Sequence, residues 1–225
     1  MKTNQHLLTV RVWDLPTRVF HWALAICIVG LLVTGNVGGN AMVWHFRIGL
    51  LVLALLMFRL VWGLAGGRWS RFAAFIYSPR SIINYLKGRG KPEHSVGHTP
   101  MGAGSVFALL AILLAQVGSG LFSDDEISAA GPLTRFVSGA TVNLATHYHK
   151  NIGKWIVVGL VVLHLAAIAF YTWRKHKLVS SMVSGDKHLA AFAPSSRDDA
   201  TSRLTALVIF GFCAAFVVWV ARLSA

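Results

Sequence analysis

Five apolar segments, each about twenty residues long, dominate the pattern of hydrophobic and polar positions. They cover residues 19–37, 46–64, 103–122, 152–173 and 204–223. Because an α-helix rises about 1.5 Å per residue, about twenty apolar residues cross a hydrocarbon core of about 30 Å. The pattern therefore predicts an all-α integral membrane protein with five transmembrane helices.

Composition supports the same class. The chain has 225 residues, of which 55% are hydrophobic, and its mean hydropathy is +0.60. No short apolar stretch with a small-residue cleavage site begins the sequence, so we expect the first span to remain in the mature protein. We expect three parts: a four-helix transmembrane domain over residues 1–182, a cytoplasmic linker over residues 183–203, and an additional C-terminal transmembrane helix over residues 204–225.

Charge is distributed unevenly between the two sides of these spans. Fifteen of the 21 basic residues flank one side: Lys2, Arg11, Arg18, Arg68, Arg71, Arg80, Lys87, Arg89, Lys91, Arg174, Lys175, Lys177, Lys187, Arg197 and Arg203. The loops on the other side contain an acidic cluster, Asp124, Asp125 and Glu126, with Arg135. The positive-inside rule then predicts a cytoplasmic N-terminus and a C-terminus outside. The net charge of +13 is explained by topology, and no groove-reading or stacking module indicates nucleic-acid binding.

The basic loop after the second span has its own pattern. We expect residues 79–86 to form an amphipathic helix on the inner membrane surface, where basic side chains attract anionic lipid. Pro100 suits the first turn of the third transmembrane helix. His94 and His98 precede that helix, and we expect them to be solvated rather than ligating.

Histidines occur at two depths of the predicted bundle. His149 and His164 lie fifteen residues apart on the fourth span, which corresponds to about 22 Å along a helix and about 60° around it. His21 on the first span matches the cytoplasmic depth of His164, and His45 on the second matches the external depth of His149. An ionisable residue inside a membrane indicates a functional site.

Two depth-matched pairs of histidines are typical of axial haem ligation, since each iron takes imidazoles from opposite sides inside a helical bundle. The chain has no C-x-x-C-H, so no c-type haem is attached covalently. The sequence therefore predicts two haem b groups with bis-histidine iron. One would be held by His21 and His164, and the other by His45 and His149.

Several residues near these histidines allow two interpretations. Arg47 and Arg59 either extend towards the membrane interface or neutralise carboxylates of a bound cofactor. Gly35 either serves ordinary helix packing or lets a flat ligand approach the backbone. His147 competes with His149 as the external ligand.

The motifs VRVWDLPTRVFHW, HFRIGLLVLALLMFRLVWG, GHTPMGA and VVLHLAAIAFY resemble the bacterial cytochrome b561 and nickel–iron hydrogenase cytochrome b subunit family. The resemblance covers roughly residues 8–185. It implies a four-helix di-haem b cytochrome of the inner membrane, which passes electrons between a redox partner and the quinone pool. By position its ligands are His21, His45, His149 and His164.

Two features depart from the family pattern. The histidines of the fourth span are fifteen residues apart, where we expect fourteen, which suggests a local helix irregularity and leaves His147 open. The fifth helix lies beyond the usual four.

Three functions follow as hypotheses. The main one is an electron-transfer subunit that serves a hydrogenase, a dehydrogenase or a c-type cytochrome, rather than a stand-alone enzyme. The second is a self-contained oxidoreductase, such as the superoxide-to-quinone activity known in this family. The third is a haem-free transporter with a histidine proton relay, although the chain lacks a convincing inverted repeat.

Overall fold

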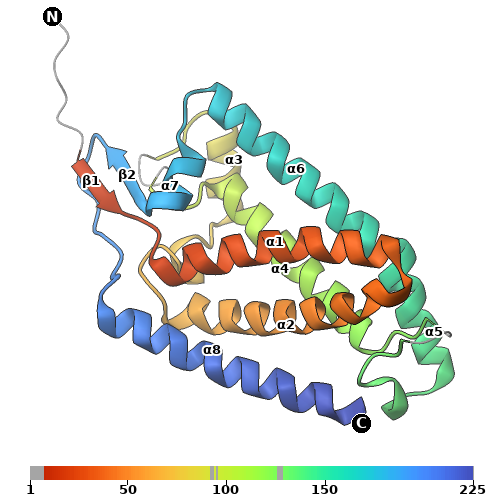
Figure 1. Cartoon of the computed structure of the whole chain (residues 1–225). Coiled ribbons are helices and arrows are strands. Elements are labelled where there is room, and N and C mark those ends of the chain that lie inside the picture. Colours follow the sequence, from red (N-terminus) through yellow and green to blue (C-terminus); the bar gives the residue numbers. More distant parts are fainter. Residues whose placement is uncertain (1–7, 92–93, 95, 126–128, 225) are drawn as a thin grey trace, which may run out of the picture. The chain divides into compact units, whose positions relative to one another are not determined.

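The computed structural model describes residues 8–91, 94, 96–125 and 129–224. In chain order its elements are β1 (Leu8–Arg11), α1 (Leu15–Val37), α2 (Met42–Ala65), α3 (Pro79–Leu86), α4 (Pro100–Leu121), α5 (Gly139–His147), a π-helical turn (Tyr148–Gly153), α6 (Lys154–Trp173), α7 (Leu178–Ser184), β2 (Asp186–Leu189) and α8 (Ala200–Ala221) (Figure 1). Short 3₁₀ turns occur at Gly39–Ala41, Phe72–Ala74, Thr134–Phe136 and Arg222–Ser224. The predicted all-α class is confirmed.

In the described part of the chain, five helical segments are long and apolar enough to cross a membrane. They are Leu15–Val37, Gly39–Ala65, Pro100–Leu121, Gly139–Trp173 and Ala200–Ala221. Each begins before the start predicted from the apolar segments. The reason is that in most of them a polar cap, rather than the first apolar residue, sets where the helix begins.

These caps follow one rule: a side-chain oxygen accepts a hydrogen bond from the backbone N–H three residues later. The bonds are Asp14 to Thr17 (2.8 Å), Thr99 to Gly102 (3.1 Å), Ser138 to Thr141 (3.3 Å) and Asp199 to Ser202 (2.8 Å). Pro100 is the first residue of α4, and α3 covers residues 79–86, so both predictions are confirmed.

The chain divides into two compact units. Unit 1 comprises Met1–Val19, Leu60–Phe107 and His164–Ala206, and unit 2 comprises Phe20–Arg59, Ala108–Leu163 and Leu207–Ala225. Every described basic residue that the sequence predicts on one side belongs to unit 1, and Lys2 lies outside the described residues. Glu126, from the predicted acidic cluster, also lies outside them.

A small sheet in unit 1 joins distant parts of the chain. Strand β1 pairs with β2 in antiparallel register, with Leu8 opposite Leu189 and Arg11 opposite Asp186. Beside it Val10, Val12, Trp13, Val96 and Ala193 form a buried apolar cluster. The segment predicted as a linker therefore contains a strand and a core residue. Strands of four residues are too short for a clear alternation of apolar and polar positions.

A buried aspartate joins the start of α1 to the end of α2 within unit 1. The side chain of Asp14 is fully buried. Besides capping α1, it accepts hydrogen bonds from Trp62 Nε1 (3.2 Å), the Gly67 N–H (3.1 Å) and Ser70 Oγ (2.7 Å). A buried carboxylate is tolerated when it is hydrogen-bonded in this way.

A second aspartate joins the starts of α1 and α8. Asp198 accepts hydrogen bonds from Arg11 (3.0 Å), Arg203 (3.0 Å) and the Leu15 N–H (3.1 Å). Burial alone would raise the pKa of Asp198, but the bonds from Arg203 and Leu15 outweigh it and hold this pKa below its usual value.

The prediction that His94 and His98 are solvated is wrong. His94 is 8% exposed, and its ring centre lies 5.0 Å from that of Tyr77. The ring centre of His98 lies 4.6 Å from that of Trp13 and 4.4 Å from that of Phe75. Aromatic side chains from other elements cover both imidazoles, and such tertiary contacts leave no local signal in the sequence.

Asp14→Ala should destabilise the protein more than Asp199→Ala, which removes the same charge from an exposed cap. Loss of Asp14 leaves several buried donors unpaired, so we expect a loss of at least about 3 kcal/mol in the free energy of unfolding, and a clearly smaller loss for the exposed cap. Unfolding of both purified variants in detergent, followed by circular dichroism, measures the difference. Equal effects would show that the Asp14 network contributes no more than a helix cap.

Candidate functional site

Two of the predicted histidines lie close together in unit 2, with their ring planes nearly perpendicular. The ring centres of His45 and His149 are 6.1 Å apart, and the ring planes are inclined by 86°. His45 lies in the first turn of α2, and His149 lies in the π-helical turn that follows α5. The structure therefore brings together one of the two histidine pairs predicted from depth.

Each imidazole is held by the backbone of a further helix. His45 Nδ1 lies 3.1 Å from the carbonyl oxygen of Leu31 on α1, and His149 Nδ1 lies 2.8 Å from that of Gln116 on α4. A carbonyl oxygen can only accept, so Nδ1 of each ring carries a proton, and in the neutral imidazole Nε2 keeps its lone pair. Within the described part of the chain, neither Nε2 makes a hydrogen bond. Both nitrogens are therefore available to a metal.

The same local pattern supports both rings. A hydroxyl lies next to each Nδ1: Thr34 Oγ1 at 3.3 Å from His45, and Ser119 Oγ at 3.4 Å from His149. A glycine follows each hydroxyl residue. A Cβ at Gly35 would lie 3.0 Å from Cε1 of His45, and one at Gly120 would lie 2.9 Å from Cε1 of His149. The space at Gly35, which the sequence assigned to helix packing or to a flat ligand, is taken by an imidazole ring.

The π-helical turn explains the unusual spacing on the fourth span. A π turn holds one more residue than an α turn, and such turns occur often at functional sites. Tyr148–Gly153 takes up one additional residue between His149 and His164, so the predicted irregularity is confirmed. Gln116 supports this turn as well, since its Nε2 donates to the His149 carbonyl oxygen at 3.0 Å.

His147 lies elsewhere. Its side chain is exposed, and its Nδ1 lies 3.3 Å from Nδ2 of Asn151, one turn along the same helix. Of the two neighbouring histidines, His149 is the one that faces His45.

The distance between the two rings fits one iron between them. A metal–imidazole bond is about 2 Å long, and the nitrogen lies about 1.1 Å from the ring centre, so two axial imidazoles on one haem iron have centres about 6 Å apart. The observed 6.1 Å agrees with this value. The donors are neutral imidazoles whose second nitrogen is hydrogen-bonded, which is the usual state of a ligating histidine.

Comparison with known proteins shows the family of the chain. The family model of prokaryotic cytochrome b561 matches residues 12–185. The chain belongs to the prokaryotic cytochrome b561 family. It is therefore a membrane cytochrome of the b type, with haem b as cofactor and electron transfer as its role. The family resemblance noted in the sequence is confirmed.

Several curated proteins match most of the chain at low identity. The probable Ni/Fe-hydrogenase 1 B-type cytochrome subunit of Escherichia coli K12 is 24% identical, over 81% of this chain and 92% of the relative. The probable Ni/Fe-hydrogenase B-type cytochrome subunit of Bradyrhizobium diazoefficiens is 25% identical, over 80% and 86%. The corresponding protein of Azotobacter chroococcum is 26% identical, over 78% and 87%.

The remaining predicted site residues have other surroundings. His21 belongs to unit 2 and His164 to unit 1, so their pairing stays a prediction. The His21 ring stands edge-on to Trp22, with 5.1 Å between the ring centres. Arg47 is exposed and lies 5.3 Å from the ring centre of Trp44, while Arg59 is buried at 3% exposure. A role for either arginine at a cofactor stays a prediction.

Sequence reasoning missed the residues that hold the imidazoles. Gln116 and Ser119 lie on the third apolar segment, which contains none of the four predicted histidine ligands. The available signal was an amide side chain within a span that is otherwise apolar, since such a group needs a partner there. The Leu31 carbonyl gave no signal, because every residue has one.

Gly120→Ala should displace the His149 ring and weaken haem retention, whereas Gly118→Ala on the same helix should not. A Cβ at Gly118 meets nothing within 4 Å. Forcing an additional methyl into a packed site destabilises it by about 1–3 kcal/mol. Each purified variant is heated, and the haem that stays bound to the protein is measured as the pyridine haemochrome. Equal haem loss would contradict the close approach at Gly120.

Proposed function

We propose that this cytochrome binds two haem b groups and carries electrons between a redox protein and the quinone pool. His45 and His149 are the axial ligands of one haem, and His21 and His164 are those of the other. The observation that supports the proposal is the 6.1 Å separation of the His45 and His149 rings, with both Nδ1 atoms bonded to helix carbonyls. When bound, haem b supplies reversible one-electron exchange at its iron.

The protein's own part is to fix the ligands. The Leu31 and Gln116 carbonyls orient the rings through Nδ1 and raise the basicity of Nε2. Through its amide, Gln116 also fixes the backbone that carries His149. His45 and His149 would hold the haem through their two Nε2 atoms, and a haem held by two imidazoles would supply electron transfer rather than oxygen chemistry.

The proposed redox partner follows from the relatives. Several are named as B-type cytochrome subunits of Ni/Fe hydrogenases, so a hydrogenase or a similar dehydrogenase is the partner that we propose here. An electron-transfer subunit needs such a partner for turnover, and the quinone is its mobile carrier in the membrane. Copurification of a redox enzyme with the tagged chain would support this role, whereas quinone reduction by the isolated chain would point to a self-contained oxidoreductase.

We place the protein in the bacterial inner membrane with its N-terminus in the cytoplasm and its C-terminus outside. The gathering of the described basic flanking residues in unit 1 supports this orientation under the positive-inside rule. In this orientation α1 runs from the cytoplasm outwards, so the start of α2, which carries His45, lies on the external side.

His149→Ala should lose one of the two haems, whereas His147→Ala should keep both. The two residues are two positions apart and differ in their surroundings, since His149 faces His45 and His147 is exposed. Haem per polypeptide, measured by pyridine haemochrome on purified protein, is the readout. His45→Ala should give the same loss as His149→Ala, because one missing axial ligand disrupts the same site.

The opposite pattern would contradict the assignment. If His147→Ala loses haem while His149→Ala retains it, the external ligand is His147, and His149 faces His45 without binding haem. If neither variant loses haem, the pair is not a ligand pair.

A further inference from the structure

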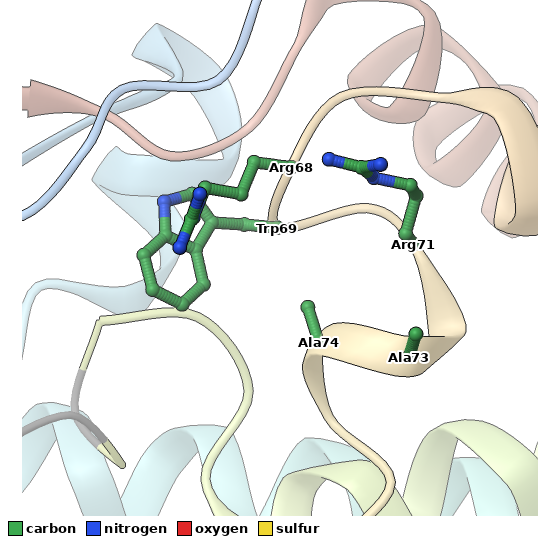
Figure 2. A pocket seen from close by; sticks show the side chains of 5 residues that line it. All are labelled: Arg68, Trp69, Arg71, Ala73 and Ala74. Carbon is green, nitrogen blue, oxygen red and sulfur yellow. The ribbon is translucent and has the colours of Figure 1, made fainter.

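A shallow hollow of about 310 Å³ lies in unit 1, directly after the end of α2. It is lined by Arg68, Trp69, Arg71, Ala73 and Ala74 (Figure 2). Figure 2 shows the Arg68 side chain beside the indole of Trp69 and the Arg71 side chain across the gap. The Arg68 guanidinium carbon lies 5.8 Å from the centre of the Trp69 ring. Both arginines are exposed, so the hollow carries two positive charges.

The described carboxylates of unit 1 are engaged elsewhere. Asp14 is hydrogen-bonded inside the first network, Asp186 pairs with Arg11, Asp198 pairs with Arg11 and Arg203, and Asp199 pairs with Arg197. Among the residues that the structure describes, none of these carboxylates forms an ion pair with an arginine of the hollow. Residues 66–91 contain no acidic residue. Glu93 lies outside the described residues. The described carboxylates of unit 1 are paired elsewhere, so the two exposed guanidinium groups of the hollow can bind an anion from outside the chain.

The surroundings indicate a membrane surface. The hollow follows Ala65, where a candidate membrane span ends. Trp69 is fixed there, because its Nε1 donates to the Pro194 carbonyl oxygen at 2.8 Å. Further along the same segment, apolar side chains are exposed, with Ile76 at 67% and Leu86 at 64%. Basic groups beside exposed apolar groups and a fixed tryptophan are typical of segments at the level of lipid head groups.

We propose that Arg68 and Arg71 bind the phosphate of an anionic phospholipid in this hollow. Guanidinium groups suit phosphate because their planar donors form paired hydrogen bonds with its oxygens. Basic pockets on the cytoplasmic side of transmembrane helices bind lipid head groups by the same chemistry. Because the hollow is open and the same segment exposes apolar side chains, a lipid with its acyl chains suits this surface better than a free phosphate ion. This site does not depend on the haem assignment.

The test compares two double variants of the full chain with the wild type. R68Q/R71Q removes both charges of the hollow, and R80Q/R89Q removes the same charge from exposed positions elsewhere on the segment. Native mass spectrometry of delipidated protein, titrated with phosphatidylglycerol, counts the lipids retained by each. Parallel titrations use phosphatidylcholine and inorganic phosphate, and the haem spectrum with circular dichroism checks the fold of each variant.

We expect R68Q/R71Q to weaken phosphatidylglycerol binding by at least about tenfold, while R80Q/R89Q stays within about twofold of the wild type. Phosphatidylcholine should bind weakly to all three proteins, and inorganic phosphate should not displace the lipid. Equal loss in the two double variants would overturn the proposal, because it would show only diffuse attraction to charge. Equal binding of phosphatidylcholine would also overturn it. Displacement by inorganic phosphate at the same concentration would show a site for the soluble ion instead.

Discussion

The hydrogen bonds from imidazole Nδ1 to backbone carbonyls are the constraint on which the site depends. In an apolar helix bundle a ligating histidine needs a partner for its second nitrogen, since an unpaired buried N–H is destabilising. The chain supplies that partner from Leu31 and Gln116 without placing a further charge in the membrane. A ring can approach a helix backbone so closely only where the side chain next to it is missing, which accounts for Gly35 and Gly120.

The π-helical turn belongs to the same arrangement. An additional residue on the fourth span would otherwise rotate His149 relative to His164, and the wider turn absorbs it locally. A widened turn alters the backbone hydrogen bonds, and the Gln116 amide binds the carbonyl oxygen of His149 there. Gln116 on α4 therefore contacts His149 twice. Its backbone carbonyl oxygen binds the imidazole, and its side-chain amide binds the backbone carbonyl oxygen of His149.

In unit 1 polar groups at the helix ends are bound by aspartate side chains, whereas backbone carbonyls bind the two imidazoles of the site. Its described aspartates fix the starts of α1 and α8 and the end of α2 through side-chain and ion-pair contacts, as Asp14 and Asp198 show. These contacts use the acidic groups internally. The positive charge that remains at Arg68 and Arg71 is therefore directed outwards.

Much of this was predictable from the sequence, and the reasons for the rest are physical. Three predictions rest on local sequence properties, and the structure agrees with each. They are the long apolar helices, the amphipathic helix at residues 79–86, and the pairing of His45 with His149. The strand pairing of β1 with β2 and the covering of His98 by Trp13 depend on residues far apart in the chain. The role of Gln116 depends on a backbone carbonyl, which carries no signature in any sequence.

Electron paramagnetic resonance of the oxidised, purified chain tests the central claim most directly, when it is combined with haem per polypeptide. The ring planes of His45 and His149 are inclined by 86°, so they are nearly perpendicular. Perpendicular imidazole ligands leave the two iron d orbitals that interact with their π systems nearly equal in energy. We therefore predict haem b in a low-spin ferric state with a strongly anisotropic signal, and that signal should be lost in His149→Ala. A high-spin signal from all the haem, or purified protein without haem despite ample supply, would contradict the paired-histidine site.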